Sequence, residues 1–133
     1  MGRVLEGKMR HVMALFGEAE KGSFEKPVLI RELPQLVDRL GNPPTESEGL
    51  FFAVQALLYQ REVLFFRVAE EGFSKHDYFL GLRHLEKRDK EIHAMCLPGV
   101  GDEEILAASQ HLCLQYKSLL ITTQKDLYDY LTS

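Results

Sequence analysis

Six carboxylates are the residues of this 133-residue chain best suited to chemistry, because each follows a segment with strand-like hydrophobicity. They are Glu18, Glu20, Glu70, Glu71, Asp102 and Asp126. In a parallel sheet the carboxyl ends of the strands meet at one edge, where α/β proteins usually bind ligands. Carboxylates gathered there could hold a metal ion or act as general acid and base. Since no pair has a diagnostic spacing and acidic loops also serve solubility, we favour a solvated edge and keep the metal or acid/base site as the alternative.

The turn Pro98-Gly99-Val100-Gly101-Asp102 is the second candidate, because a helix is expected to begin directly after it. Free backbone N–H groups and the helix dipole converge at a helix N-terminus, so Gly99, Val100, Gly101 and Asp102 could bind a phosphate. The segment lacks the full glycine patterns of dinucleotide and P-loop sites. Asp102 would also cap the helix while repelling an anion. We therefore favour a structural turn over a phosphate site.

A thiol nucleophile with a histidine base is suggested by Cys96 and His93. Three residues apart in a strand, however, the two side chains point to opposite faces, so packing in the core is the favoured interpretation. The second cysteine, Cys113, forms neither a metal-ligand spacing nor a disulfide framework with the first. We expect no catalytic residue, no metal and no cofactor, and we predict that the chain is not an enzyme.

The elements that must position these residues are arranged around residues 61–72, whose apolar centre is bounded by charges and closed by a glycine. Such a centre predicts a strand buried on both faces, which is typical of central strands in α/β sheets. The preceding helix, residues 49–59, is apolar nearly all round and has Ser47 as its predicted N-cap. Helices are therefore expected on both faces of the sheet.

Strand and helix patterns alternate along the rest of the chain. Strand-like or extended segments are residues 12–16, 27–31, 92–97 and 119–122, and helical segments are residues 33–40, 74–85, 102–113 and 126–131. The charged run at residues 86–91 is interpreted as a solvated helix end. The alternation predicts an α/β fold: a three-layer domain with a mainly parallel sheet of about four strands and helices on both faces.

Composition and charge narrow the classes of function. The chain is 45% hydrophobic and 27% charged, which is typical of an ordinary globular domain. No apolar run approaches the ~20 residues that span a bilayer, and the first ten residues lack a signal-peptide core, so we expect a cytoplasmic protein without membrane insertion. A net charge of -4 disfavours nucleic-acid binding. Residues 1–10 are predicted to be a flexible N-terminal arm, and residues 11–133 a single domain.

Short motifs in a particular order connect the chain to a known family. The motifs are Gly17-Glu18-Ala19-Glu20-Lys21-Gly22, Lys26-Pro27-Val28-Leu29-Ile30, Leu40-Gly41 at a helix end, Ala53-Val54, Phe65-Phe66-Arg67-Val68, and the apolar run ending in Pro98-Gly99. In this order they resemble the tail sheath proteins of contractile phage tails and contractile injection systems. The resemblance covers residues 15–121. Ser23 stands where the family often has proline, Gln60-Arg61 where it has a glycine pair, and sheath proteins are much longer.

The resemblance implies a structural subunit that polymerises around a tube by lending strands to its neighbours. The partners it implies are further copies of this chain and a tube or baseplate protein, within the cytoplasm or a phage-like particle assembled there. The expected interaction residues are Val4 and Leu5 in the arm and Arg67, Glu70 and Glu71 after the central strand. The alternative function is that of a small-ligand or phosphate-binding α/β domain, or of an enzyme, that uses the loops after the strands.

Overall fold

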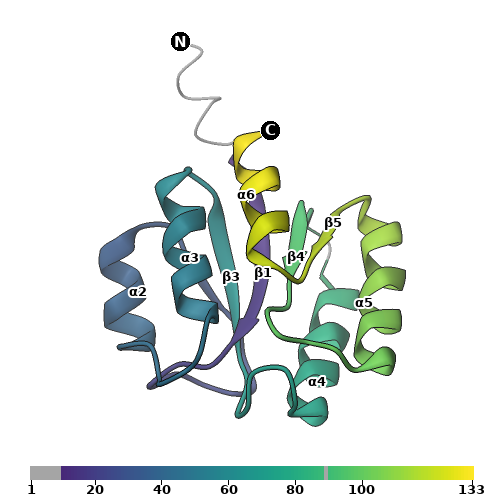
Figure 1. The fold of residues 1–133 in the computed structure, drawn as a ribbon, viewed down its shortest axis with the longest axis horizontal. Coiled ribbons are helices and arrows are strands. Elements are labelled where there is room, and N and C mark those ends of the chain that lie inside the picture. The colour runs from purple at the N-terminus through teal and green to yellow at the C-terminus, as the bar shows by residue number, and fades with distance from the viewer. Residues whose placement is uncertain (1–9, 89) are drawn as a thin grey trace.

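The computed structural model describes residues 10–88 and 90–133, which form one α/β domain. A single β-sheet lies at its centre and has helices on both faces (Figure 1). The sheet has the strand order β2-β3-β1-β4-β5. Its strands are β1 (Val12–Gly17), β2 (Val28–Ile30), β3 (Glu62–Arg67), β4 (Ala94–Cys96) and β5 (Leu119–Ile121). The helices are α2 (Leu33–Leu40), α3 (Gly49–Leu58), α4 (Lys75–Glu86), α5 (Glu103–Tyr116) and α6 (Gln124–Thr132). The predicted three-layer architecture is confirmed.

The central strand β3 separates two hydrophobic cores, because successive side chains of a strand point to opposite faces. Val63 and Phe65 pack into the core that is covered by α2, α3 and α6. Leu64 and Phe66 pack into the opposite core, which α4 and α5 cover. All four side chains are buried, which explains why this strand is apolar without interruption.

The sheet contains one strand more than predicted. β1, β3, β4 and β5 are parallel, whereas β2 pairs antiparallel with β3, with Leu29 opposite Leu64. This fifth strand is the extended segment that Pro27 introduces. Proline has no backbone N–H to donate to a neighbouring strand, so it is found at the edge of a sheet or at the start of a strand. The position of β2 at the sheet edge agrees with this rule.

The order of the parallel strands places a topological switch at β1. The chain passes from β1 through α3 to β3 on one side, and then through α4 to β4 on the other side. The two connecting helices lie on opposite faces, so they diverge at the carboxyl ends of β1 and β4 (Figure 1). In open α/β sheets this divergence forms the crevice in which ligands usually bind.

Three helix caps were predicted, at Ser47, Ser74 and Asp102, and they differ in outcome. Ser74 occupies the N-cap position of α4, but its side chain makes no capping hydrogen bond. Asp102 caps α5 as expected, since its side chain accepts hydrogen bonds from the backbone N–H groups of Glu104 and Ile105. Ser47 does not cap α3, because its hydroxyl donates to the carbonyl of Pro44 at 2.8 Å and the helix begins one residue later, after Glu48. The N-terminus of α3 is capped instead by a residue that is distant in sequence.

Candidate functional site

The crevice at the carboxyl ends of the parallel strands contains a cavity of about 380 Å³. Its lining residues come from the loops after β1, β3 and β4 and from the approach to α3. They are Glu18, Thr45, Glu46, Glu48, Glu70, Glu71, Phe73, Pro98 and Gly99. The structure thus brings Glu18, Glu70 and Glu71 of the candidate carboxylates around one cavity.

Glu71 is the residue that caps α3. Its carboxylate accepts hydrogen bonds from the backbone N–H of Glu48 at 2.6 Å and of Gly49 at 3.1 Å. It also accepts one from the backbone N–H of Glu18 at 2.9 Å, and the Glu18 carboxylate accepts one from the backbone N–H of Glu71 at 2.8 Å. This reciprocal pair holds the end of β1, the end of β3 and the start of α3 together.

The reciprocal pair depends on two glycines that allow close approach of the backbone. A Cβ atom on Gly49 would lie 2.8 Å from the Cα of Gly17 and 2.9 Å from the Glu71 carboxylate. Neither distance is compatible with a side chain, so any larger residue would push α3 away from β1. Gly17 and Gly49 therefore let a single carboxylate reach three backbone amides.

Burial sets the electrostatics of Glu71. The pKa of Glu71 is raised from its ordinary value, mainly because burial penalises the charged form and, to a smaller extent, because Glu18 is close. Hydrogen bonds from the amides of Glu48, Glu18 and Gly49 oppose the shift. A carboxylate with a raised pKa can exchange a proton, but both oxygens of Glu71 already accept backbone hydrogen bonds.

The remaining candidate carboxylates lie elsewhere. Glu20 accepts a hydrogen bond from the backbone N–H of Asn42 at 2.9 Å and so supports the turn after α2. Asp126 lies in the first turn of α6, beside β5. Within residues 10–88 and 90–133, no group of three or more His, Cys, Asp or Glu side chains is placed to hold a metal ion.

The Gly99–Asp102 turn is organised around the cap of α5. Gly99 has a φ of 77°, which favours glycine. The Asp102 carboxylate occupies the helix N-terminus and lies 3.5 Å from the ammonium group of Lys75. The hydrogen bond from the amide of Ile105, helped by Lys75, lowers the pKa of Asp102. A negative charge thus stands where the alternative hypothesis places a phosphate.

The expected interaction residue Arg67 is engaged within the chain. Its guanidinium donates hydrogen bonds to the carbonyls of Ala19 at 3.1 Å, Gly22 at 2.6 Å and Glu20 at 3.3 Å. It also lies over the ring of Phe24, 4.2 Å from the centroid. Arg67 therefore fixes the loop that follows β1. Its role in contacts with other chains stays a prediction.

The N-terminal interaction residues Val4 and Leu5 lie outside the described residues. Arg10, the last residue of the predicted arm, donates hydrogen bonds to the carbonyls of Gln60 at 3.2 Å and Arg31 at 3.3 Å. The first described residue is thus attached to the body of the domain.

The cysteines and His93 do not form a catalytic pair. Cys96 is completely buried, and burial raises the pKa of its thiol far above the ordinary value. The Nδ1 atom of His93 accepts a hydrogen bond from the backbone N–H of Val12, and its ring stacks on that of His11 with 4.1 Å between centroids. Cys113 is a free thiol whose sulfur lies 3.5 Å from that of Met95.

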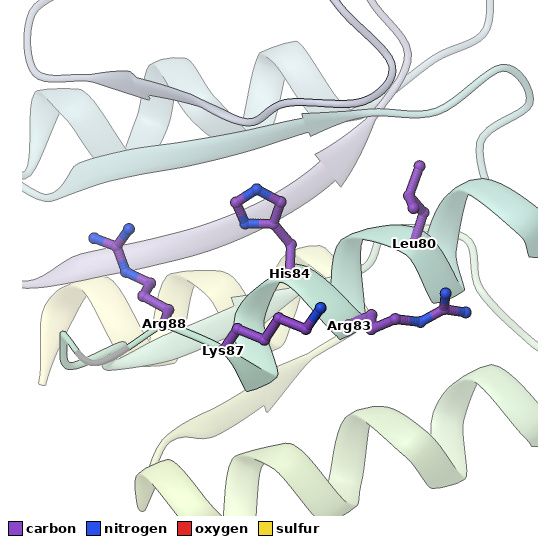
Figure 2. A pocket seen from close by; sticks show the side chains of 5 residues that line it. All are labelled: Leu80, Arg83, His84, Lys87 and Arg88. Atoms are coloured by element: carbon purple, nitrogen blue, oxygen red, sulfur yellow. The ribbon is translucent and has the colours of Figure 1, made fainter.

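A cationic groove on α4 was missed in the sequence. It has a volume of about 280 Å³ and is lined by Leu80, Arg83, His84, Lys87 and Arg88 (Figure 2). The alternating signs of residues 86–91 suggested a solvated helix end. Residues four apart, however, share one face of a helix, and this spacing of Arg83 and Lys87 was the signal that could have indicated the groove.

The edge strand β5 has a hollow on each side. One hollow of about 380 Å³ is lined by α5 and β5, and one of about 310 Å³ by β5 and α6. Leu119 in β5 is 55% exposed and Leu114 at the end of α5 is 79% exposed. Within the described residues β5 pairs with β4 alone, so its other side is open.

The fold and these sites define a three-layer α/β domain with an acidic crevice at its topological switch, a cationic groove and an open sheet edge. Comparisons with protein families, with curated proteins and with solved structures give no match to this chain. No helix in residues 10–88 and 90–133 is long and apolar enough to cross a membrane.

Proposed function

We propose that this chain is a non-enzymatic structural protein that assembles with further copies of itself by strand addition, as a sheath-like subunit would. The observation that supports the proposal is the open edge of β5. The N–H of Leu119 donates to the carbonyl of His93 on the β4 side. Because alternate residues of a strand direct their backbone groups to opposite sides, the N–H and carbonyl of Leu120 face outward.

An exposed strand edge is a template for another chain. Main-chain hydrogen bonds would provide affinity, and the two hollows beside β5 would accept alternate side chains of the added strand. Residues 1–9 are the segment we propose as that strand. In a larger assembly a tube or baseplate protein would be a further partner, as the resemblance to sheath proteins implies.

Sedimentation velocity tests the proposal on the full chain, on a chain lacking residues 1–9 and on Leu119→Lys. A lysine on an edge strand disfavours strand addition. We expect the full chain to form oligomers and both variants to shift toward monomer while remaining folded. Val37→Lys is the matched control, because Val37 is 60% exposed on α2, away from β5.

A full chain that stays monomeric at high concentration would refute self-association. Oligomers that persist equally in the Leu119→Lys variant would refute the role of the β5 edge.

The crevice at the switch point supports a second candidate function, the binding of a small ligand. Its lining by Glu18, Glu46 and Glu70 fits a cationic ligand better than the phosphate considered from the sequence. A ligand-dependent increase in melting temperature, in a chain that stays monomeric, would favour this second candidate.

A further inference from the structure

The cationic groove contains positive charges that make no ion pair within the part of the chain that the structure describes. The ion pairs there involve Arg31, Lys75, His93 and Lys125, whereas Arg83, Lys87 and Arg88 are in none of them. The Nε atom of Arg88 is buried without a hydrogen-bond partner among these residues. Buried polar groups are normally paired, so this guanidinium has hydrogen-bonding capacity left for a partner in the groove.

The floor of the groove is apolar. Figure 2 shows Leu80, His84 and Arg88 projecting to the same side of α4, toward the strands, with Arg83 and Lys87 along the rim. The His84 ring packs edge-on against Phe66 with 6.3 Å between centroids. The occupant that fits is therefore an apolar group with negative charges beside it.

The chain carries such a group at the other end of α4. Phe73 precedes the helix, is 78% exposed and lines the acidic crevice together with Glu46 and Glu70. It is more exposed than Phe51 and Tyr128, which are 56% and 59% exposed. A cavity of about 150 Å³ holds a benzene ring, so the groove, with about 280 Å³, has room for the phenyl group.

Phe73 cannot reach the groove of its own chain. Leu80, the groove residue nearest to it in the sequence, lies about 10 Å away along the rigid helix, and His84, in the middle of the groove, lies about 16 Å away. Two complementary surfaces at different places on one chain make a head-to-tail contact, which forms rings or open filaments.

We propose that Phe73, flanked by Glu46 and Glu70, docks into the Leu80/Arg83/His84/Lys87/Arg88 groove of the next copy. The inference rests on the proposed self-association and adds a second contact, distinct from the β5 edge. Carboxylates would pair with the arginines and the lysine at the rim, and cation–π contact would stabilise the ring.

Charge reversal with rescue tests the contact. The groove variant is Arg83→Glu/Lys87→Glu, and the crevice variant is Glu46→Lys/Glu70→Lys. Each variant alone should associate about tenfold more weakly than the unmodified chain. An equimolar mixture should recover association, because each variant presents the surface that its partner now complements. Phe73→Ser should weaken association at all salt concentrations, and circular dichroism would verify that each variant is folded.

The salt dependence of association distinguishes the groove contact from strand addition at β5. Raising the salt from about 20 to about 300 mM should weaken the groove contact strongly, since the Debye length falls below 10 Å, and strand addition only slightly. Association that is abolished by Leu119→Lys but is insensitive to salt and charge reversal would overturn the inference and leave the proposed function intact. Absence of association in the full chain and in the mixture would overturn both. A melting shift caused by inorganic phosphate, without association, would assign the groove to a small anion and also overturn the inference.

Discussion

Replacement of Glu71 by alanine would remove the acceptor of three backbone amides at once. These amides belong to Glu18, Glu48 and Gly49. A buried donor left without a partner costs about 1–3 kcal/mol, and water in the adjacent crevice would replace part of the loss. Removing a buried charge recovers a further part. We therefore expect Glu71→Ala to lower the free energy of unfolding by about 2–3 kcal/mol.

Urea unfolding monitored by circular dichroism measures this loss. With a slope of about 2 kcal/mol per molar urea, the midpoint should fall by about 1 M at an unchanged slope. The control is Glu70→Ala, because Glu70 is the exposed neighbour and its hydrogen bonds, to Phe73 and Ser74, are made by its backbone N–H and carbonyl. We expect that control to change stability by less than about 0.5 kcal/mol. Equal midpoints for the two variants would refute the capping role of Glu71.

The pH dependence provides an independent check on Glu71. Its pKa in the folded chain is raised above the ordinary value of 4.5, so the folded state binds the proton more tightly than the unfolded state. The stabilisation from this proton is fully present below pH 4.5 and is lost as the pH rises through the folded pKa. The free energy of unfolding of the unmodified chain should therefore fall relative to that of Glu71→Gln as the pH rises from about 4 to about 7. A rise of the unmodified chain relative to Glu71→Gln over this range would contradict the raised pKa.

Three further predictions concern packing, and thermal unfolding measures each of them. Gly72→Ala should destabilise more than Gly99→Ala: both have positive φ, but only at Gly72 would the new Cβ lie 2.6 Å from a backbone oxygen, and equal losses would contradict this. Gly81→Ala should lower the melting temperature, because the new Cβ would collide with the ring of Phe16 and this cost outweighs a gain of about 1 kcal/mol in helix propensity. A higher melting temperature would show that the Phe16 ring moves aside. Cys96→Ser should keep assembly and cost about 1–3 kcal/mol, whereas lost assembly in a folded variant would reveal a functional thiol.

The fold was predictable because its determinants are local. The uninterrupted apolar centre of β3 required cover on both faces, and the two cores provide it. Asp102 was predictable as a cap for the same reason, since an N-cap and the amides it accepts from lie within three residues.

The cap of α3 was not predictable, because the residue that supplies it is 22 positions from Gly49. Ser47 satisfied the local pattern for a cap, yet its hydroxyl turns to Pro44. Glu71 reaches the helix only after β1 and β3 have paired and two glycines have let α3 approach the sheet. The sequence shows the carboxylate of Glu71, but it does not show that this carboxylate lies within hydrogen-bonding distance of the amides of α3.

The opposite charges at the two ends of α4 follow from the parallel topology. Every helix that follows a parallel strand begins at the carboxyl edge of the sheet, where its free N–H groups favour carboxylates. Asp77 lies in the first turn of α4, and Glu103 and Glu104 lie in that of α5. The C-terminal turn of α4 favours cations for the same reason and contains Arg83 and His84. Helix-dipole compensation thus places acidic and basic surfaces at different ends of one domain, and a surface of each sign on every copy is what head-to-tail assembly requires.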